Sequence, residues 1–257
     1  MNPTPALSEM TQKILAQTAL VIPAYNEAET LPGLIAEVRA VFPALDITVV
    51  DDGSQDRTVR AARAAGARVL SLPCNLGVGG AVQTGFCDAW ERGFAYVVRI
   101  DGDGQHPPAE ILKLAAAMAE GNADLVIGSR YADAGTEYVN TWSRRLGIRF
   151  LAVFLSAICR RRVTDPTSGF WMVNRGLLAC FARYYPVDYP EPEALAFLSR
   201  QGYGFREVAA TFRPRQAGVS SIGAWDTFYY AVKVGLALVA DRMRPINPRF
   251  SKKENHP

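Results

Sequence analysis

The sequence predicts an α/β fold in which helices cover both faces of a mostly parallel β-sheet. Three observations support this prediction. Short apolar runs, typical of buried strands, alternate with segments of helical periodicity along the first half of the chain. Three of these runs end in polar clusters that contain acidic residues. The chain has 257 residues, of which 49% are hydrophobic, so it can bury a core of its own and we expect one main domain.

The alternation begins at residues 19–22, an apolar run that Pro23 ends, as expected of a buried parallel strand. Residues 27–42 place apolar side chains at helical spacing, and residues 47–50 form the next apolar run. The pattern then repeats. We expect three further helices, at 57–65, between the glycine-rich turn at 75–80 and residue 92, and at 108–120. Further strands are expected at 68–72, 96–100 and 124–127.

After the last of these strands the alternation is weaker. Residues 143–159 have the composition of an apolar helix with arginines before and after it, and a second apolar helix is expected at 227–240. We therefore divide the chain into a polar, irregular tail (1–17), the main domain (18–222), and a C-terminal apolar helix with a basic tail (223–257). The last part is suited to contact a membrane surface or a partner protein.

Composition excludes several classes of function. The formal net charge of +3 is too weakly basic to indicate nucleic-acid binding. The 4 cysteines form no CxxC pair and the chain has 2 histidines, which argues against a zinc site and favours free thiols in a reducing compartment. The N-terminus lacks the pattern of a secretory signal, and no apolar run approaches the roughly 18 residues that span a bilayer. We expect a cytoplasmic protein that is soluble or lies at the inner face of the membrane.

Two aspartates one residue apart follow the expected strand at 96–100. The backbone leaves the sheet there, so Asp101 and Asp103 need not alternate between its faces and both carboxylates can reach one cation. Oxygen ligands of this kind suit Mg²⁺ or Mn²⁺. The flanking glycines relax the turn, and Gln105 can add a neutral oxygen. The same spacing occurs in ordinary turns, so the motif gains weight from its neighbours.

Polar clusters also follow the first two strands. Asp52 follows the second, where a carboxylate can accept hydrogen bonds from a base or a ribose, whereas Asp51 and Ser54 fit a helix cap equally well. Glu27 follows the first strand and either begins a helix or contacts a nucleotide. The glycine-rich turn at 75–80 can approach a phosphate, but an ordinary tight turn has the same pattern. In a parallel sheet these strand ends converge on one crevice.

Together these segments resemble the inverting family 2 glycosyltransferases of the GT-A fold, and in particular the dolichyl- and polyprenyl-phosphate sugar synthases. The resemblance covers residues 19–222 and rests on the segments 21–27, 49–58, 75–81, 101–107, 126–130 and 165–170. It implies that the donor nucleotide and its phosphates contact Pro23, Ala24, Tyr25, Glu27, Asp52, Gly79, Asp101 and Gly102. It also implies that the metal is bound by Asp101, Asp103 and Gln105.

The same resemblance implies an acceptor side of the site. Its residues are Arg130, Asp165, Ser168, Arg215 and Ser220. Residues 213–221 resemble a mobile loop of the family, in which Ser221 stands where the family has lysine, so that one positive charge facing phosphate is missing.

The segment 189–193 is a second departure from the family, because two prolines accompany Glu191 and Glu193. Either carboxylate can orient the donor sugar or act as a base, and both fit equally well as charges at a helix N-terminus. We take Glu193 as a catalytic candidate, together with Asp103, Arg130 and Arg215.

The activity that the resemblance implies is inverting, metal-dependent transfer of a sugar from a UDP- or GDP-sugar to a polyprenyl phosphate. A lipid phosphate is an anion at neutral pH and needs no protein base, whereas a sugar hydroxyl, the acceptor in polysaccharide synthesis, needs one. That acceptor is the alternative hypothesis. A nucleotidyltransferase and a non-catalytic nucleotide-binding module represent other classes. The arginine-flanked helix suits a membrane interface or a membrane-protein partner.

Overall fold

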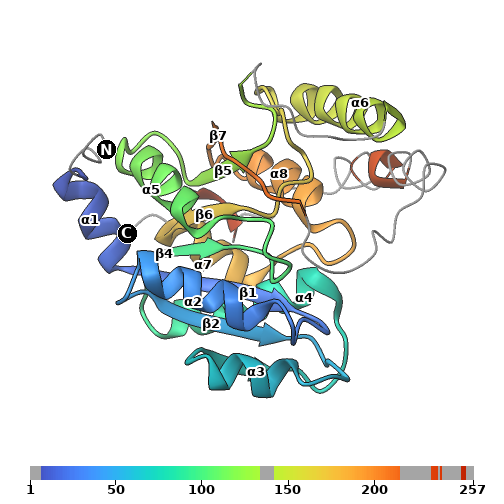
Figure 1. Ribbon diagram of the computed structural model, residues 1–257. Coiled ribbons are helices and arrows are strands. Elements are labelled where there is room, and N and C mark those ends of the chain that lie inside the picture. The colour runs from blue at the N-terminus through green and yellow to red at the C-terminus, as the bar shows by residue number, and fades with distance from the viewer. Residues whose placement is uncertain (1–6, 134–141, 215–232, 237, 239–249, 253–257) are drawn as a thin grey trace.

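The structure is a computed structural model that describes residues 7–133, 142–214, 233–236, 238 and 250–252 (Figure 1). Within these ranges a sheet of 7 strands has the order β3-β2-β1-β4-β6-β5-β7. The strands are β1 (Thr18–Ala24), β2 (Asp46–Asp51), β3 (Arg68–Ser71), β4 (Tyr96–Arg99), β5 (Leu125–Ser129), β6 (Trp171–Asn174) and β7 (Phe205–Ala209). Neighbouring strands run parallel except where β6 pairs antiparallel with β4 and β5. The predicted mostly parallel sheet is confirmed.

Helices cover both faces of the sheet, as the alternating sequence pattern predicts (Figure 1). One face carries α1 (Glu9–Ala16), α2 (Leu31–Val41), α3 (Thr58–Ala64) and α5 (Ile111–Ala119), which follows the short 3-10 helix η1 (Pro108–Glu110). The other face carries α4 (Gly77–Glu91), α6 (Trp142–Cys159), α7 (Arg175–Arg183) and α8 (Pro190–Arg200). Alternate strand residues supply the two cores, so that Val21 packs beneath α4 while Leu20 and Ile22 pack on the opposite face.

The expectation of an irregular tail over residues 1–17 is wrong for residues 9–16, which form α1. The helix begins after Ser8, whose hydroxyl oxygen accepts a hydrogen bond of 3.2 Å from the Thr11 N–H. Ile14 is buried in the core beside α5. A helix of two turns is too short for apolar periodicity to stand out, and burial of Ile14 in the core stabilises it.

The C-terminal segment shares the core of the main domain, although the sequence placed a boundary at residue 222. Val234 and Leu238 are buried in the core that contains α4 and α7, and the Phe250 ring lies 5.6 Å from that of Tyr184. Of the helix expected at 227–240, residues 233–236 and 238 are described and are helical. No helix in the described ranges is long and apolar enough to cross a bilayer.

The topology brings several segments to one edge of the sheet. The carboxyl ends of β1, β2, β4 and β5 meet there because these strands run in one direction. Strand β6 runs the opposite way, so its beginning lies at the same edge and carries residues 167–169 with it. The sequence pattern of alternating strands and helices did not predict this second contribution.

Candidate active site

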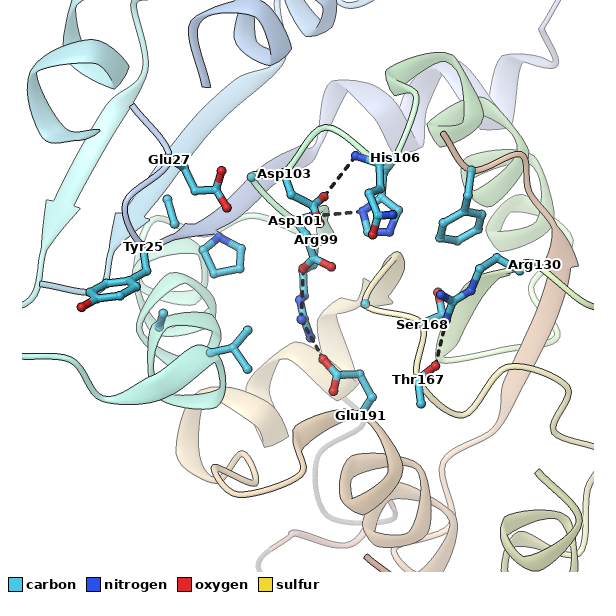
Figure 2. A pocket seen from close by; sticks show the side chains of 18 of the residues that line it. Tyr25, Glu27, Arg99, Asp101, Asp103, His106, Arg130, Thr167, Ser168 and Glu191 are labelled. Carbon is cyan, nitrogen blue, oxygen red and sulfur yellow. Dashed lines mark hydrogen bonds and ion pairs between the residues drawn. The ribbon is translucent and has the colours of Figure 1, made fainter. Parts of the chain in front are cut away.

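A cavity of about 470 Å³ opens at this edge of the sheet (Figure 2). Its walls come from the segments after β1, β2, β4, β5 and β7, from the segment before β6, and from α4, α6 and α8. Of the residues proposed from the sequence, those that line it are Pro23, Ala24, Tyr25, Glu27, Asp52, Asp101, Gly102, Asp103, Gln105, Arg130 and Ser168. The strand-end clusters therefore do converge on one crevice.

The loop after β4 carries the two aspartates at the centre of the cavity. The Asp103 carboxylate accepts a hydrogen bond of 3.1 Å from the Gln105 N–H, and Gly104 has a φ of 74°, a left-handed conformation that favours glycine. The side chain of Asp101 is 35% exposed and that of Asp103 is nearly buried. Both aspartates thus line the cavity, Asp101 with the more exposed side chain and Asp103 with its carboxylate bonded to the backbone of the loop.

These residues fit a divalent cation. In the described ranges, no three His, Cys, Asp or Glu side chains are grouped so that they could hold a metal ion. Asp101, Asp103 and Gln105 nevertheless line one cavity, and Mg²⁺ is usually held by one or two carboxylates together with substrate phosphates and water. The donor set is therefore of the kind that binds a cation jointly with a diphosphate.

The His106 side chain is hydrogen-bonded to the backbone of this loop. Its Nδ1 accepts a hydrogen bond of 3.1 Å from the Asp101 N–H, so the neutral ring carries its proton on Nε2. Burial lowers its pKa below the ordinary value, although the Asp101 and Asp103 carboxylates act in the opposite direction. The ring stacks on Phe170 with centroids 5.1 Å apart. His106 lies within the segment 101–107 that matches the family, but its residue type and position alone did not indicate this contact.

The segment after β1 forms one end of the cavity, where Tyr25 is exposed (Figure 2). The Glu27 carboxylate accepts a hydrogen bond of 2.7 Å from the Thr30 hydroxyl. Asp52, after β2, accepts one of 2.7 Å from the Leu76 N–H and so connects β2 with the beginning of α4. An exposed aromatic ring beside two carboxylates is suited to a nucleoside.

Gly79 does not line the cavity, although the sequence placed it among the donor contacts. A Cβ atom there would lie 2.6 Å from the carbonyl oxygen of Pro186 and 2.7 Å from the Cα of Val187. The glycine allows α4 to approach that backbone closely. Its neighbours Val78 and Ala81 are the residues of α4 that reach the cavity.

Arg130, at the end of β5, lies at the opposite end of the cavity from Tyr25 (Figure 2). Its Nε and Nη2 donate hydrogen bonds of 2.7 Å each to the two carboxylate oxygens of Asp165, and Nη2 also donates one of 2.8 Å to the Thr167 hydroxyl. Asp165 is itself buried outside the cavity. It therefore holds Arg130, while Arg130 faces the cavity.

Ser168 lines the cavity, but its hydroxyl donates a hydrogen bond of 2.5 Å to the Gly128 carbonyl. The loop that carries Asp165 is held by Glu207 of β7, whose carboxylate accepts hydrogen bonds of 2.7 Å from the Thr164 N–H and 2.8 Å from the Asp165 N–H. Burial raises the pKa of Glu207, and these two donors act against that rise.

Of the two glutamates in the first turn of α8, Glu191 lines the cavity, whereas Glu193, our catalytic candidate, does not. Glu191 lies in the first turn of α8 and forms an ion pair of 2.7 Å with Arg99, the last residue of β4. Arg99 also pairs with Asp101 at 3.2 Å. Sequence reasoning gave Arg99 no role, although an arginine in an apolar strand directly before two acidic residues was a visible signal.

Arg215 and Ser220, together with Ser221, lie outside the described residues. The chain that leads to them passes the aspartate loop, because the Arg213 N–H donates a hydrogen bond of 2.9 Å to the Gln105 carbonyl.

The family model and the relatives that match this chain all describe glycosyltransferases. Residues 19–181 match the family model "Glycosyl transferase family 2". Undecaprenyl-phosphate mannosyltransferase of Micrococcus luteus is 34% identical over 213 residues, which cover 81% of this chain and 82% of that protein. Polyprenol monophosphomannose synthase of Mycolicibacterium smegmatis is 30% identical over 233 residues, covering 85% and 84%.

Among solved structures, glucosyl-3-phosphoglycerate synthase from Mycobacterium tuberculosis in complex with phosphoglyceric acid matches with a TM-score of 0.68 and 21% identity, covering 94% of this chain and 85% of that one. The same enzyme in complex with Mn²⁺, UDP and phosphoglyceric acid matches with a TM-score of 0.66 and 20% identity, covering 94% and 84%. At this identity the likeness shows that the folds agree.

Proposed function

The chain belongs to glycosyl transferase family 2, and we propose that this glycosyltransferase moves a hexose from a nucleotide-sugar to the phosphate of a polyprenyl phosphate. The polarity of the cavity carries the proposal. Carboxylates line the end near Tyr25 and the centre, while Arg130 stands at the other end (Figure 2). The names of the two relatives, both of which specify mannose and a polyprenol or its phosphate, support it and make mannose the first sugar to test.

The donor is proposed to bind along the acidic part of the cavity. Glu27, Asp52, Asp101 and Asp103 all line that part, and together they would repel a diphosphate in the absence of a cation. We therefore propose that Asp101 and Asp103, with Gln105, hold Mg²⁺ or Mn²⁺. When bound, the cation neutralises the charge that develops on the departing nucleoside diphosphate.

The acceptor phosphate is proposed to bind Arg130. The two hydrogen bonds to Asp165 use Nε and Nη2 and fix the plane of the guanidinium, so the group is oriented before a ligand arrives. Arg130 and the two aspartates line the same cavity of about 470 Å³. A guanidinium that is held in one orientation opposite the donor diphosphate is suited to bind an anionic acceptor.

In the proposed reaction an acceptor phosphate oxygen attacks the anomeric carbon. The bond from that carbon to the β-phosphate oxygen breaks on the opposite face, the nucleoside diphosphate leaves, and the configuration inverts. The attacking oxygen is already an anion, so no proton has to be removed. Glu191, the carboxylate of α8 that lines the cavity, is held in an ion pair with Arg99. We propose that it helps to position the donor sugar rather than to accept a proton.

The acceptor is tested by incubating the purified protein with Mn²⁺, radiolabelled GDP-mannose or a UDP-hexose, and a short-chain polyprenyl phosphate. We expect an acid-labile, lipid-soluble product of inverted anomeric configuration. The matched polyprenol without phosphate should give none, and Asp103→Asn should give none while melting at the same temperature as the wild type. An acid-stable product formed on a sugar hydroxyl would instead support the polysaccharide alternative.

We further propose that α6 rests on the cytoplasmic face of the membrane that holds the lipid acceptor. Leu146, Phe150 and Val153 recur at helical spacing, and the latter two are 57% and 72% exposed. The opposite face of the same helix contributes Ile148 and Leu151 to the cavity wall. Residues 142–162 contain six arginines and no acidic residue, which suits anionic lipid headgroups.

Flotation with vesicles of phosphatidylglycerol and phosphatidylcholine tests this contact. The wild-type protein should float with the vesicles. The Val153→Asp variant should not, although its melting temperature should equal that of the wild type. Met10→Asp is the matched control, because Met10 is 55% exposed on α1, on the far side of the molecule from α6 (Figure 1). If both variants bind vesicles as the wild type does, α6 is not the contact.

A further inference from the structure

Arg99 is a fully buried arginine that contacts two carboxylates of the cavity. Its Nη2 lies 2.7 Å from Glu191 Oε1 and 3.2 Å from Asp101 Oδ1, and its Nη1 donates a hydrogen bond of 3.4 Å to the Tyr185 hydroxyl. Figure 2 shows the side chain extended between the two acids. One guanidinium nitrogen is thus shared between the loop after β4 and the first turn of α8.

The surrounding structure holds this guanidinium in place. Arg99 pairs with Trp171 across β4 and β6, and its Cζ lies 5.9 Å from the Trp171 ring centroid. A Cβ at residue 169 would lie 2.8 Å from Arg99 Nη2 and 3.0 Å from Asp101 Oδ2, so a larger residue there would displace the ion pair. Burial favours the neutral form, but the carboxylates of Glu191 and Asp101 raise the pKa of Arg99 above its ordinary value, and it stays charged.

This charge opposes a cation at Asp101. The carboxylate that the proposed function assigns to the divalent ion already has a positive partner, and like charges at short range repel each other strongly in a partly buried site. Glu191 acts in the opposite direction, because it attracts the same nitrogen at the shorter distance. Arg99 Nε is buried without a hydrogen-bond partner, so among the described contacts the side chain bonds through its terminal nitrogens.

We propose that Arg99 is an internal counter-ion that lowers the affinity of the unliganded site for its divalent cation, and that Glu191 sets how strongly it does so. The cation then binds tightly only together with the nucleotide diphosphate, whose negative charge outweighs that of Arg99. This inference rests on the proposed function, since it takes Asp101 as a metal ligand. In it, Arg99 and Glu191 are positioning residues that act through Asp101.

The test is a titration with Mn²⁺ alone, in which electron paramagnetic resonance measures the free ion and no substrate is present. Arg99→Met removes the competing charge and should lower the Kd for Mn²⁺ by about tenfold. Glu191→Gln leaves Asp101 as the one remaining carboxylate partner of Arg99 in this pair of contacts and should raise that Kd by about threefold, a smaller change because Glu191 contacts Arg99 and not Asp101 in these ion pairs. The double variant should bind Mn²⁺ more tightly than the wild type and less tightly than Arg99→Met.

The matched control is Arg92→Met, because Arg92 is also paired with two carboxylates, those of Asp46 and Asp88, but does not line the cavity. Its Kd for Mn²⁺ should equal that of the wild type. A purely structural role for Arg99 predicts that both single variants shift the Kd in the same direction or not at all, and either result overturns the inference.

Loss of folding in Arg99→Met does not end the test, since Glu191→Gln and the double variant bury no new unpaired arginine or glutamate and still differ in their predicted direction. A different failure would be recognisable. If neither the wild type nor any variant shows Mn²⁺ binding that Asp103→Asn removes, then the cation site of the proposed function is wrong, and the inference falls with it.

Discussion

The ion pair between Arg130 and Asp165 allows a quantitative prediction. Both side chains are buried, with 9% and 0% of their surfaces exposed, and the carboxylate accepts hydrogen bonds from Arg130 Nε, Nη2 and backbone N–H. Asp165→Asn keeps the volume but removes the negative charge that Arg130 Nε and Nη2 contact. Breaking a pair of this kind costs about 3–5 kcal/mol. We expect a loss of about 3 kcal/mol in unfolding free energy, since Thr167 remains as a partner.

For a chain of this length, 1 kcal/mol corresponds to about 2–4 °C, so the melting temperature of Asp165→Asn should fall by roughly 6–12 °C. Denaturant unfolding of Arg130→Met, Asp165→Asn and the double variant completes a cycle. Arg130→Met leaves the buried Asp165 carboxylate without its partner and should also cost about 3 kcal/mol. The double variant should be nearly as stable as the wild type, so the two single losses add to a coupling energy of about 6 kcal/mol. A loss below about 1 kcal/mol for Asp165→Asn, or a double variant as unstable as the sum of the single ones, would refute this reasoning.

Three further predictions concern the fold. Gly85→Ala should lower the unfolding free energy by about 1–2 kcal/mol, because a Cβ there would overlap a valine methyl of β1, whereas the control Gly33→Ala has open space and should stabilise α2 by about 0.5–1 kcal/mol. Ser8→Ala should cost about 1 kcal/mol in a thermal melt, since it removes the cap of α1. Burial raises the pKa of Cys180 to about 12, so it stays protonated at pH 8, and we expect Ellman's reagent to react fast with the exposed Cys74 alone; two fast thiols would contradict this.

Several features of the fold could be predicted because their causes are local. Strand β1 is an apolar run that continues through Pro23 to Ala24, and β2 is an apolar run that ends at Asp51. Helices α2 and α4 show their buried faces as periodicity. Helix α1 was not predicted, because a helix of two turns contains too few apolar residues to show a helical periodicity. The antiparallel direction of β6 was not predicted, because the residues of a strand carry no mark of the direction in which it pairs.

Part of the candidate site could likewise be predicted from the sequence, and part of it could not. The donor-side residues follow β1, β2 and β4, and parallel strands bring their carboxyl ends to one edge, so Tyr25, Asp52 and Asp101 could be grouped from the sequence. The loop 165–169 reaches that edge only because β6 is antiparallel. Its motif indicated a site, but whether Asp165 faces a ligand or holds Arg130 depends on side-chain directions that no spacing specifies.

The residue types, the family and the acidic cluster after β4 follow from the sequence, because each depends on neighbours within a few positions or on a strand order that parallel pairing imposes. The pairing of charges does not. Arg99 and Glu191 are 92 positions apart, and either glutamate of α8 was compatible with the pattern. The rotation of that helix against the sheet turns Glu191 toward the cavity. Such rotations are set by packing of the whole core, and for that reason the three-dimensional structure was needed to find the network around Asp101.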